Sequence, residues 1–296
     1  MAYKFGFIFL KGLSQDLESN FSYSFNNNVR FFREIPPIDA TRWQEWLGLQ
    51  WEDVVTSNAV IEVKTETQAP NVLDNENEDL KFTCRELWLS LMLVMPCYLE
   101  NAYFLTGGES DNRIEVRQFF KFDRWFNLGK DFVQTLVASE ISKWKDIFLS
   151  LDEVYKKKED FLRLKRGLLC FLKGCSESNV SFRLPYFVRA LEALIIPDKG
   201  KTTKQFQSRV AYWWISSKQN KHFPDNVPKT LEDIYDLRCK FEHMHVLATK
   251  DMDMSILSSY RCEVLARNAY CDILIDDKKL NMFICDDSIK EFWKTK

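Results

Sequence analysis

The stretch YDLRCKFEHMH, residues 235–245, gathers side chains suited to acid–base chemistry on an anionic substrate. The chain of 296 residues has three histidines, and two of them, His243 and His245, lie in this stretch shortly after Arg238. A histidine titrates near neutral pH and can exchange protons with a substrate. An arginine is always cationic and forms paired hydrogen bonds with phosphate or carboxylate groups. The stretch is therefore the first candidate for a catalytic site.

The same stretch is predicted to be helical, because its apolar residues recur at helical spacing. The expected core-facing residues are Ile234, Leu237, Phe241 and Met244. At roughly 100° per residue, His245 falls on the flank of Arg238, whereas His243 lies about 140° from Arg238. Arg238 and His243 can meet at one substrate in two ways. Either the helix ends near His243, or a second copy of the helix supplies the partner.

Cys239, His245 and the more distant Glu192 could take part in other chemistry. Cys239 and His243 are spaced i, i+4, as zinc ligands on a helix can be, and His245 is close to them. No second pair of ligands lies near them in the sequence, so neither a metal nor another cofactor is expected. Glu192 lies in the apolar run ALEAL, where a carboxylate needs a partner. It is predicted either to hold a basic residue such as Arg209 or to lie beside the active site.

The charge of the chain is unevenly distributed, although the whole sequence carries a formal net charge of only −2. Residues 154–221 contain fifteen Lys and Arg against five Asp and Glu, a surplus of ten positive charges. In this basic segment Arg163, Arg166 and Lys173 point away from the apolar stripe of a predicted helix. The surplus indicates a polyanionic partner. The alternative is a solvated basic face that acidic neighbours balance in the folded protein.

The first part of the chain is predicted to mix strands and helices. Apolar runs predict strands over residues 3–10 and 59–66, and a short helix is predicted over residues 40–49. The acidic run DNENED, residues 74–79, predicts a surface loop ahead of an apolar helix near residues 80–95.

Residues 103–120 contain a glycine pair, Gly107 and Gly108, between two strand-like runs. Because paired glycines are typical of turns, the stretch predicts two strands joined at that point. From about residue 130 onward only helical periodicity is found. Two long amphipathic helices are predicted there, over residues 130–151 and 152–174.

Later helices carry start signals. Pro185 is predicted to begin one of them, because proline suits a first helical turn. A helix is expected over residues 202–217, and Thr230 with Asp233 predicts a capping box for the next one. The last long helix covers about residues 252–275. The patterns together predict an α+β protein, in which a small mixed α/β domain (1–128) is followed by an all-α helical domain (129–296).

Several classes of function lack support in the sequence. It contains no P-loop, no G-x-G-x-x-G, no H-E-x-x-H and no G-x-S-x-G motif, which argues against nucleotide hydrolysis, hydride transfer and common hydrolase mechanisms. The apolar stretch LWLSLMLVMPCYL is interrupted by Ser90 and Pro96, so no membrane partner is expected. The eight cysteines form no C-x-x-C pair and no signal peptide is recognised, which predicts free thiols in the cytoplasm.

Three segments in order, LPYFVRALEALI, KTTKQFQSRVAYWW and LEDIYDLRCKFEH, resemble the ApeA-like branch of the HEPN superfamily. The third contains the R-x4-H signature of that superfamily, as Arg238 and His243. The resemblance covers about residues 130–275 and is strongest over residues 184–243. The ordered trio and its spacing carry it, because R-x4-H alone is a short pattern. Residues 1–125 resemble no family.

The resemblance implies a fold, an assembly and an activity. The fold would be a HEPN-type helical bundle that forms a homodimer through the helical domain, with the two motif helices facing each other. The activity would be that of a metal-independent endoribonuclease, with RNA, including tRNA, as the substrate. Many such proteins are toxins or antiviral defence effectors that stop translation. The N-terminal domain would sense the trigger or restrain the helical part.

The resemblance also assigns roles to residues. Arg238 and His243 would be the catalytic pair, because RNA supplies its own nucleophile and needs only proton transfer and a cation at the phosphorane. The candidate helpers are His245, Cys239 and Glu192. The candidates for RNA binding are Arg163, Arg166, Lys173 and Arg209.

Two positions differ from the usual pattern of the family. Cys239 follows the arginine where a small polar residue is common, and Met244 follows the histidine where the ApeA-like branch favours glycine. Both differences favour the alternative function, a non-catalytic HEPN module that binds RNA or a protein partner. In that case Arg238 would pair with Asp236 or Glu242.

Overall fold

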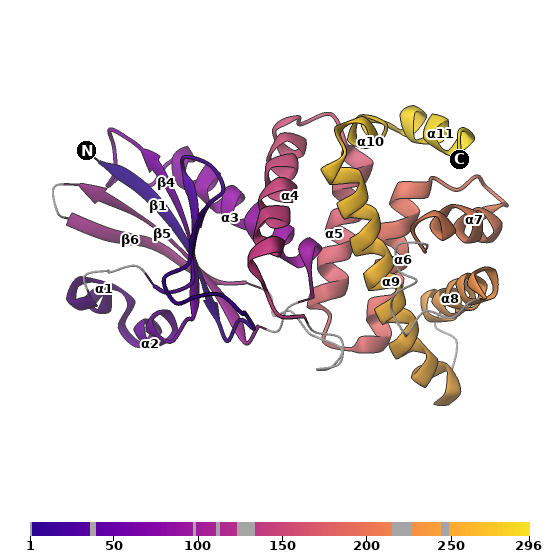
Figure 1. The fold of residues 1–296 in the computed structure, drawn as a ribbon, viewed down its shortest axis with the longest axis horizontal. Coiled ribbons are helices and arrows are strands. Elements are labelled where there is room, and N and C mark those ends of the chain that lie inside the picture. The colour runs from indigo at the N-terminus through magenta and orange to yellow at the C-terminus, as the bar shows by residue number, and fades with distance from the viewer. Residues whose placement is uncertain are drawn as a thin grey trace. The chain divides into compact units, whose positions relative to one another are not determined.

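The computed structural model describes residues 2–35, 40–96, 99–110, 113–122, 134–214, 226–243 and 249–296. With these gaps, residues 2–122 and 134–148 form one compact unit, and residues 149–296 form another. The boundary predicted after residue 128 lies outside the described residues, and residues 134–148 pack with the first unit. All named strands lie in the first unit, and the second is helical, which confirms the predicted α+β class (Figure 1).

The first unit is built on a six-stranded antiparallel sheet of order β2-β3-β4-β1-β5-β6. Its strands are β1 (Tyr3–Lys11), β2 (Ser22–Ser24), β3 (Val29–Phe32), β4 (Ala59–Glu66), β5 (Asn101–Ser110) and β6 (Arg113–Lys121). β1 lies inside the sheet, where Ile8 is opposite Ile61 of β4 and Phe104 of β5. Both faces of β1 are covered, which explains its continuous apolar run. The strands predicted over residues 3–10 and 59–66 are confirmed.

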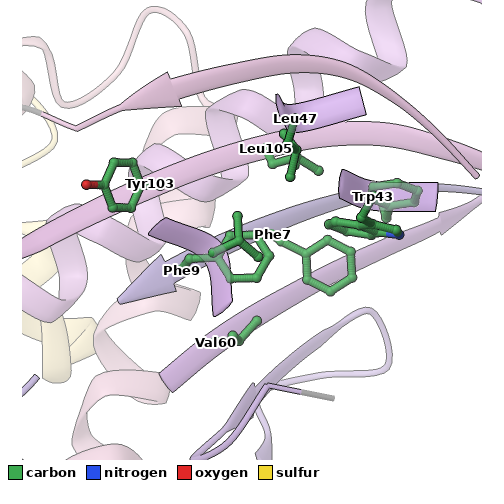
Figure 2. Packing of buried hydrophobic residues seen from close by; sticks show 9 residues of the cluster. Phe7, Phe9, Trp43, Leu47, Val60, Tyr103 and Leu105 are labelled. Atoms are coloured by element: carbon green, nitrogen blue, oxygen red, sulfur yellow. The ribbon is translucent and has the colours of Figure 1, made fainter. Parts of the chain in front are cut away.

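Helices cover both faces of this sheet (Figure 1). These helices are α1 (Ala40–Leu47), the 3-10 turn η1 (Gly48–Gln50) and α2 (Trp51–Val55) on one face, and α3 (Asn75–Val94) on the other. On the α1 face, Trp43 lies 5.6 to 6.4 Å, between ring centroids, from Phe5, Phe7 and Phe9 of β1. Figure 2 shows the apolar cluster around these rings, which fixes α1 on the sheet.

The turn predicted at Gly107 and Gly108 is wrong, because both glycines lie inside β5. A Cβ atom on Gly108 would lie 1.8 Å from the carbonyl oxygen of Pro70, and one on Gly107 would lie 2.2 Å from that of Glu115. The strand pairing is irregular between Thr106 and Gly107. These glycines therefore allow close backbone approach at a bulge, which is the other common role of glycine in a strand.

The acidic run at residues 74–79 is not a loop but the N-cap and first turn of α3. The Asp74 carboxylate accepts a hydrogen bond from the backbone N–H of Glu76, and Asn77 accepts one from the backbone of Asp74. Acidic groups are favoured there because they satisfy free backbone N–H groups at a positive helix end. Asp74 and Glu76 also hold the fully buried Lys4, whose Nζ lies 2.6 and 3.0 Å from their carboxylates.

The second unit contains the remaining helices, apart from the first part of α4, which belongs to the first unit. They are α4 (Ala138–Lys156), α5 (Leu162–Ser176), α6 (Val180–Ile195), α7 (Thr202–Trp214), α8 (Val227–Glu242), α9 (Thr249–Ile275), α10 (Asp277–Asn281) and α11 (Asp286–Lys294). α6 contacts α5, α7, α8, α9 and α11. Among the residues that the structure describes, no helix combines the length and apolar character needed to cross a bilayer.

The helices predicted over residues 130–151 and 152–174 have different boundaries. α4 begins only at Ala138, because Leu136 forms a parallel β-bridge with Gln15. The continuous helix predicted over residues 152–174 is interrupted between α4 and α5. Phe161 stands at the interruption with a left-handed backbone, φ 59°, and a buried ring. Because the buried Phe161 lies at helical spacing from the buried Leu164 and Leu168, the sequence shows a helical pattern although the helix is interrupted there.

Pro185 does not begin a helix. α6 begins at Val180, capped by Asn179, whose side chain accepts a hydrogen bond from the backbone N–H of Ser181 over 3.1 Å. Pro185 lies inside the helix, where it cannot donate to the carbonyl of Ser181.

The capping box predicted at Thr230 and Asp233 is also wrong. α8 begins at Val227, because the side chain of Asn226 accepts a hydrogen bond from the backbone N–H of Lys229 over 3.2 Å. The Thr230 hydroxyl donates to the carbonyl of Asn226 over 2.9 Å, as is common for threonine inside a helix.

Candidate functional site

Arg238 lies one turn before the end of α8, where two carboxylates hold its guanidinium. Its Nη2 lies 3.2 Å from Oε2 of Glu192 on α6, and its Nη1 lies 2.8 Å from Oε2 of Glu242. The three side chains are mostly buried, with exposed fractions of 15% to 19%. Burial alone would lower the pKa of Arg238, but the two carboxylates outweigh it and the pKa is raised. Arg238 is a fixed cation.

Glu192 is shared between Arg238 and Tyr235. The Tyr235 hydroxyl donates to Oε1 of Glu192 over 3.0 Å, and the Arg238 guanidinium lies 5.4 Å from the centroid of the Tyr235 ring. Burial raises the pKa of Glu192, and Arg238 and Tyr235 offset this only in part. The partner suggested by the sequence, Arg209, is wrong, because Arg209 donates to backbone carbonyls at the end of α6.

His243 is exposed and follows α8 directly as its C-cap. Its backbone N–H donates to the carbonyl of Cys239 over 3.0 Å, and its φ of −89° lies within about 30° of the helical value. Its Cβ therefore projects close to the helical direction, about 140° from Arg238. α8 ends at Glu242, as the first of the two alternatives drawn from the sequence requires. This backbone geometry nevertheless favours the arrangement in which a second copy completes the pair.

Glu242 links Arg238 to a further cation, Arg189. Oε1 of Glu242 accepts a hydrogen bond from Nε of Arg189 over 3.0 Å, and the Arg189 side chain is 53% exposed. Tyr235, Glu192, Arg238, Glu242 and Arg189 thus form a continuous polar row between α6 and α8. The pairing of Arg238 with Glu242 is readable from their i, i+4 spacing, whereas the sequence gives no signal for Arg189 and Tyr235.

The remaining helper candidates are placed as follows. Cys239 is half-buried and forms a side-chain hydrogen bond with Arg238. His245 and Met244 lie outside the described residues. Within the described ranges, no group of three or more His, Cys, Asp or Glu side chains is arranged to hold a metal ion.

The four residues predicted to bind RNA lie in different surroundings. Arg163 is paired with Asp286 through two hydrogen bonds of 2.9 Å each. Arg166 and Lys173 are exposed on α5, and neither has an ion-pair partner in the part of the chain that the structure describes. Arg209 is occupied at the end of α6. Arg166 and Lys173 therefore offer unpaired charge to a polyanion.

A cleft of about 690 Å³ opens over α5 and α6. Its charged lining residues are Arg163, Arg166, Arg189, Glu192 and Asp286. Glu192 borders the cleft and also contacts Arg238. Glu192 therefore connects the cleft directly to the candidate catalytic arginine.

The described cysteines differ strongly in exposure. Cys84 and Cys262 are fully buried, and burial raises the pKa of both thiols. Cys285 is exposed at the N-cap of α11. Its Sγ lies 3.1 Å from Oγ of Ser288, and this hydrogen bond lowers the pKa of Cys285. The Cys285 thiol is therefore accessible to solvent, and its lowered pKa makes it easier to ionise.

Comparison with family models, with curated proteins and with solved structures finds no match to this chain. The resemblance to the HEPN superfamily accordingly stays a prediction from the residues that carry it.

Proposed function

We propose that this protein is a metal-independent endoribonuclease of the HEPN type in which Arg238 and His243 are catalytic. The observation that carries the proposal is the presence of both residues at one end of α8. His243 is exposed as the C-cap, and Arg238 is held one turn earlier by two carboxylates. A fixed cation and an exposed imidazole, which can exchange protons with a substrate, suit RNA cleavage.

The proposed reaction uses the nucleophile that RNA itself contains. The ribose 2′-oxygen attacks the adjacent phosphorus and loses its proton, while the bond to the 5′-oxygen breaks and that oxygen gains a proton. The products are a 2′,3′-cyclic phosphate and a 5′-hydroxyl. His243 would exchange these protons. Arg238, whose pKa is raised, would stabilise the charge of the phosphorane.

The site is proposed to be completed in a homodimer. Apolar side chains are exposed close to the end of α8, where the Phe182 ring is 54% exposed and lies 6.3 Å from the Phe241 ring. Met252 and Ile256 are exposed one turn apart on α9, and Met252 contacts Ser181, the neighbour of Phe182. A second copy that covered these side chains would bring two ends of α8 together.

The basic segment, residues 154–221, is proposed to supply affinity for RNA, chiefly through the unpaired charges of Arg166 and Lys173. Such affinity weakens steeply as the salt concentration rises, because binding of the protein releases counterions from the RNA. By the resemblance, the cellular role proposed is that of a toxin or antiviral defence effector acting in the cytoplasm, with tRNA as a candidate substrate.

A second function is supported by one observation. Glu192 and Glu242 already balance the charge of Arg238, which leaves little of it for a phosphate unless a carboxylate moves away. The alternative is therefore a non-catalytic HEPN module that binds RNA or a protein partner, in which the polar row between α6 and α8 is structural.

The deciding experiment incubates the purified protein with total RNA and with tRNA in EDTA. His243→Ala and Arg238→Lys should each abolish cleavage, because a lysine lacks the paired donors of arginine. Lys240→Ala is the matched control, since Lys240 lies on the same turn of α8 but pairs with Asp251. Cleavage that survives His243→Ala, or that needs a metal, would contradict the mechanism. Binding of RNA without cleavage would favour the module.

A further inference from the structure

The cleft over α5 and α6 concentrates arginines in a way that the proposed reaction does not use. Arg163, Arg166 and Arg189 line it from two helices, against two carboxylates, Glu192 and Asp286. Its lining therefore carries an excess of positive charge. A guanidinium offers forked pairs of N–H donors, the geometry that suits a phosphate.

Each of the three arginines has N–H donors that are not used in the ion pairs described above. Arg163 uses Nε and Nη2 for Asp286, which leaves Nη1. Arg189 uses Nε for Glu242, and its side chain is 53% exposed. Arg166 has no ion-pair partner among the described residues. An anion can therefore be bound in the cleft without first breaking either ion pair.

The size and the apolar part of the lining point to a ligand larger than an inorganic ion. The volume of about 690 Å³ falls in the range of small-molecule sites. Leu162, Ala193 and Pro197 supply apolar surface beside the arginines. Gly167 also lines the cleft, and it is required for packing, because a Cβ there would lie 1.8 Å from the Tyr270 hydroxyl.

We infer that this cleft binds a phosphorylated nucleotide, with the phosphate on Arg163, Arg166 and Arg189 and the nucleoside on the apolar part of the lining. The nucleotide is either free in solution or the phosphorylated end of a nucleic-acid strand, since both present the same chemistry. The inference does not depend on RNA cleavage. It gives Arg189, which the sequence did not single out, a role in ligand binding.

The site lies next to the candidate catalytic arginine. Arg189 shares Glu242 with Arg238, and Glu192 lies in contact with both the cleft and Arg238. A phosphate that attracted Arg189 would weaken its hold on Glu242. The occupied cleft would then change the electrostatic surroundings of Arg238, so that binding in the cleft and binding at Arg238 are coupled.

The test measures binding to the full chain by titration calorimetry. The probes are adenosine 5′-monophosphate, adenosine, and a 2′-deoxy tetranucleotide with or without a 5′-phosphate, which cannot be cleaved through a 2′-hydroxyl. Each phosphorylated probe should bind at least about tenfold more tightly than its unphosphorylated partner. Equal affinity for adenosine monophosphate and the phosphorylated tetranucleotide indicates a free nucleotide, and tighter binding of the tetranucleotide indicates a strand end. If neither adenosine 5′-monophosphate nor the phosphorylated tetranucleotide binds, the inference is overturned.

Two variants separate a built site from general attraction. Arg166→Ala should weaken binding of the phosphorylated probe about tenfold, whereas Lys278→Ala, which removes the same charge from an exposed position on α10 outside the cleft and the basic segment, should change it less than about twofold. Asp286→Asn should tighten binding about threefold, because it removes the carboxylate that competes for Arg163. Equal losses in Arg166→Ala and Lys278→Ala, or weaker binding in Asp286→Asn, would refute the site.

Discussion

Arg238 on α8 and Glu192 on α6 form an ion pair of 3.2 Å across 46 positions of sequence, and both side chains are more than four-fifths buried. The pKa of Glu192 is nevertheless raised, because its burial outweighs the attraction of Arg238. The pair therefore contributes little net stability, but each partner makes burial of the other tolerable. This relationship leads to the first two predictions.

Replacing Arg238 alone should be costly. Arg238→Met leaves Glu192 buried without its cation, and we expect the free energy of unfolding at neutral pH to fall by about 1 to 3 kcal/mol. Glu192→Gln alone should change it by less than about 1 kcal/mol, since Arg238 retains Glu242. The double variant should regain most of the stability that Arg238→Met loses. Urea denaturation measures all three, and a double variant less stable than Arg238→Met would contradict the argument.

The pH dependence of stability should carry the signature of Glu192. Its folded pKa lies above the ordinary value of 4.5, so its contribution to stability is complete below that pH and is lost as the pH rises through the folded pKa. The glutamine side chain of the Glu192→Gln variant does not titrate. The stability of this variant relative to the wild type should therefore increase as the pH is raised from 4.5 toward neutrality. Denaturation curves at several pH values would show the opposite trend if Glu192 were stabilised as a carboxylate.

Because Lys4 pairs with Asp74 and Glu76, we expect the first unit to lose stability in acid. The hydrogen bond from Lys4 lowers the pKa of Asp74, and hydrogen bonds from Thr67 and Lys4 lower that of Glu76. The stability that they contribute is present above their ordinary values of 3.8 and 4.5 and is lost as the pH falls through the folded values.

The double variant Asp74→Asn, Glu76→Gln should therefore be less stable at neutral pH and lose less stability on acidification. The control is Asp79→Asn, which lies exposed on the next turn of α3. Circular dichroism during acid titration measures the effect. Identical acid unfolding of the double variant and the wild type would show that Lys4 is not the cause.

The proposed homodimer makes a prediction about Phe182. Phe182→Asp places a charge among exposed apolar side chains at the end of α8, and we expect it to shift the protein to the 35.1 kDa monomer. Val72→Asp is the control, because Val72 is equally exposed, at 52%, but lies in the first unit. Light scattering distinguishes the outcomes. A wild type that is monomeric at micromolar concentration would rule out the dimer.

Local patterns in the sequence were enough to predict most elements but not their ends. β1, β4 and α9 follow from apolar periodicity, because it reports which residues are buried. The boundaries depend on contacts that periodicity does not contain. α3 begins after Asp74 because the Asp74 side chain accepts a hydrogen bond from the backbone N–H of Glu76. Phe161 is buried even though the chain is not helical at this residue.

The candidate site divides in the same way. Arg238, Glu242 and His243 belong to one helix, so their relation could be derived from spacing alone. Glu192 and Arg189 come from α6, and their contacts with α8 depend on how the two helices pack. Spacing within one helix cannot decide this, and for that reason the pairing of Glu192 with Arg209 that the sequence suggests is wrong.

The exposed thiol of Cys285 has a practical consequence for experiments. Its lowered pKa and its position before Asp286, which lines the cleft, make it the first described cysteine to react with a maleimide dye near neutral pH. Cys84, Cys175 and Cys262 are shielded by burial. A fluorophore attached to Cys285 would sit at the rim of the proposed nucleotide site and report its occupancy in single-molecule recordings, with no change to the arginines themselves.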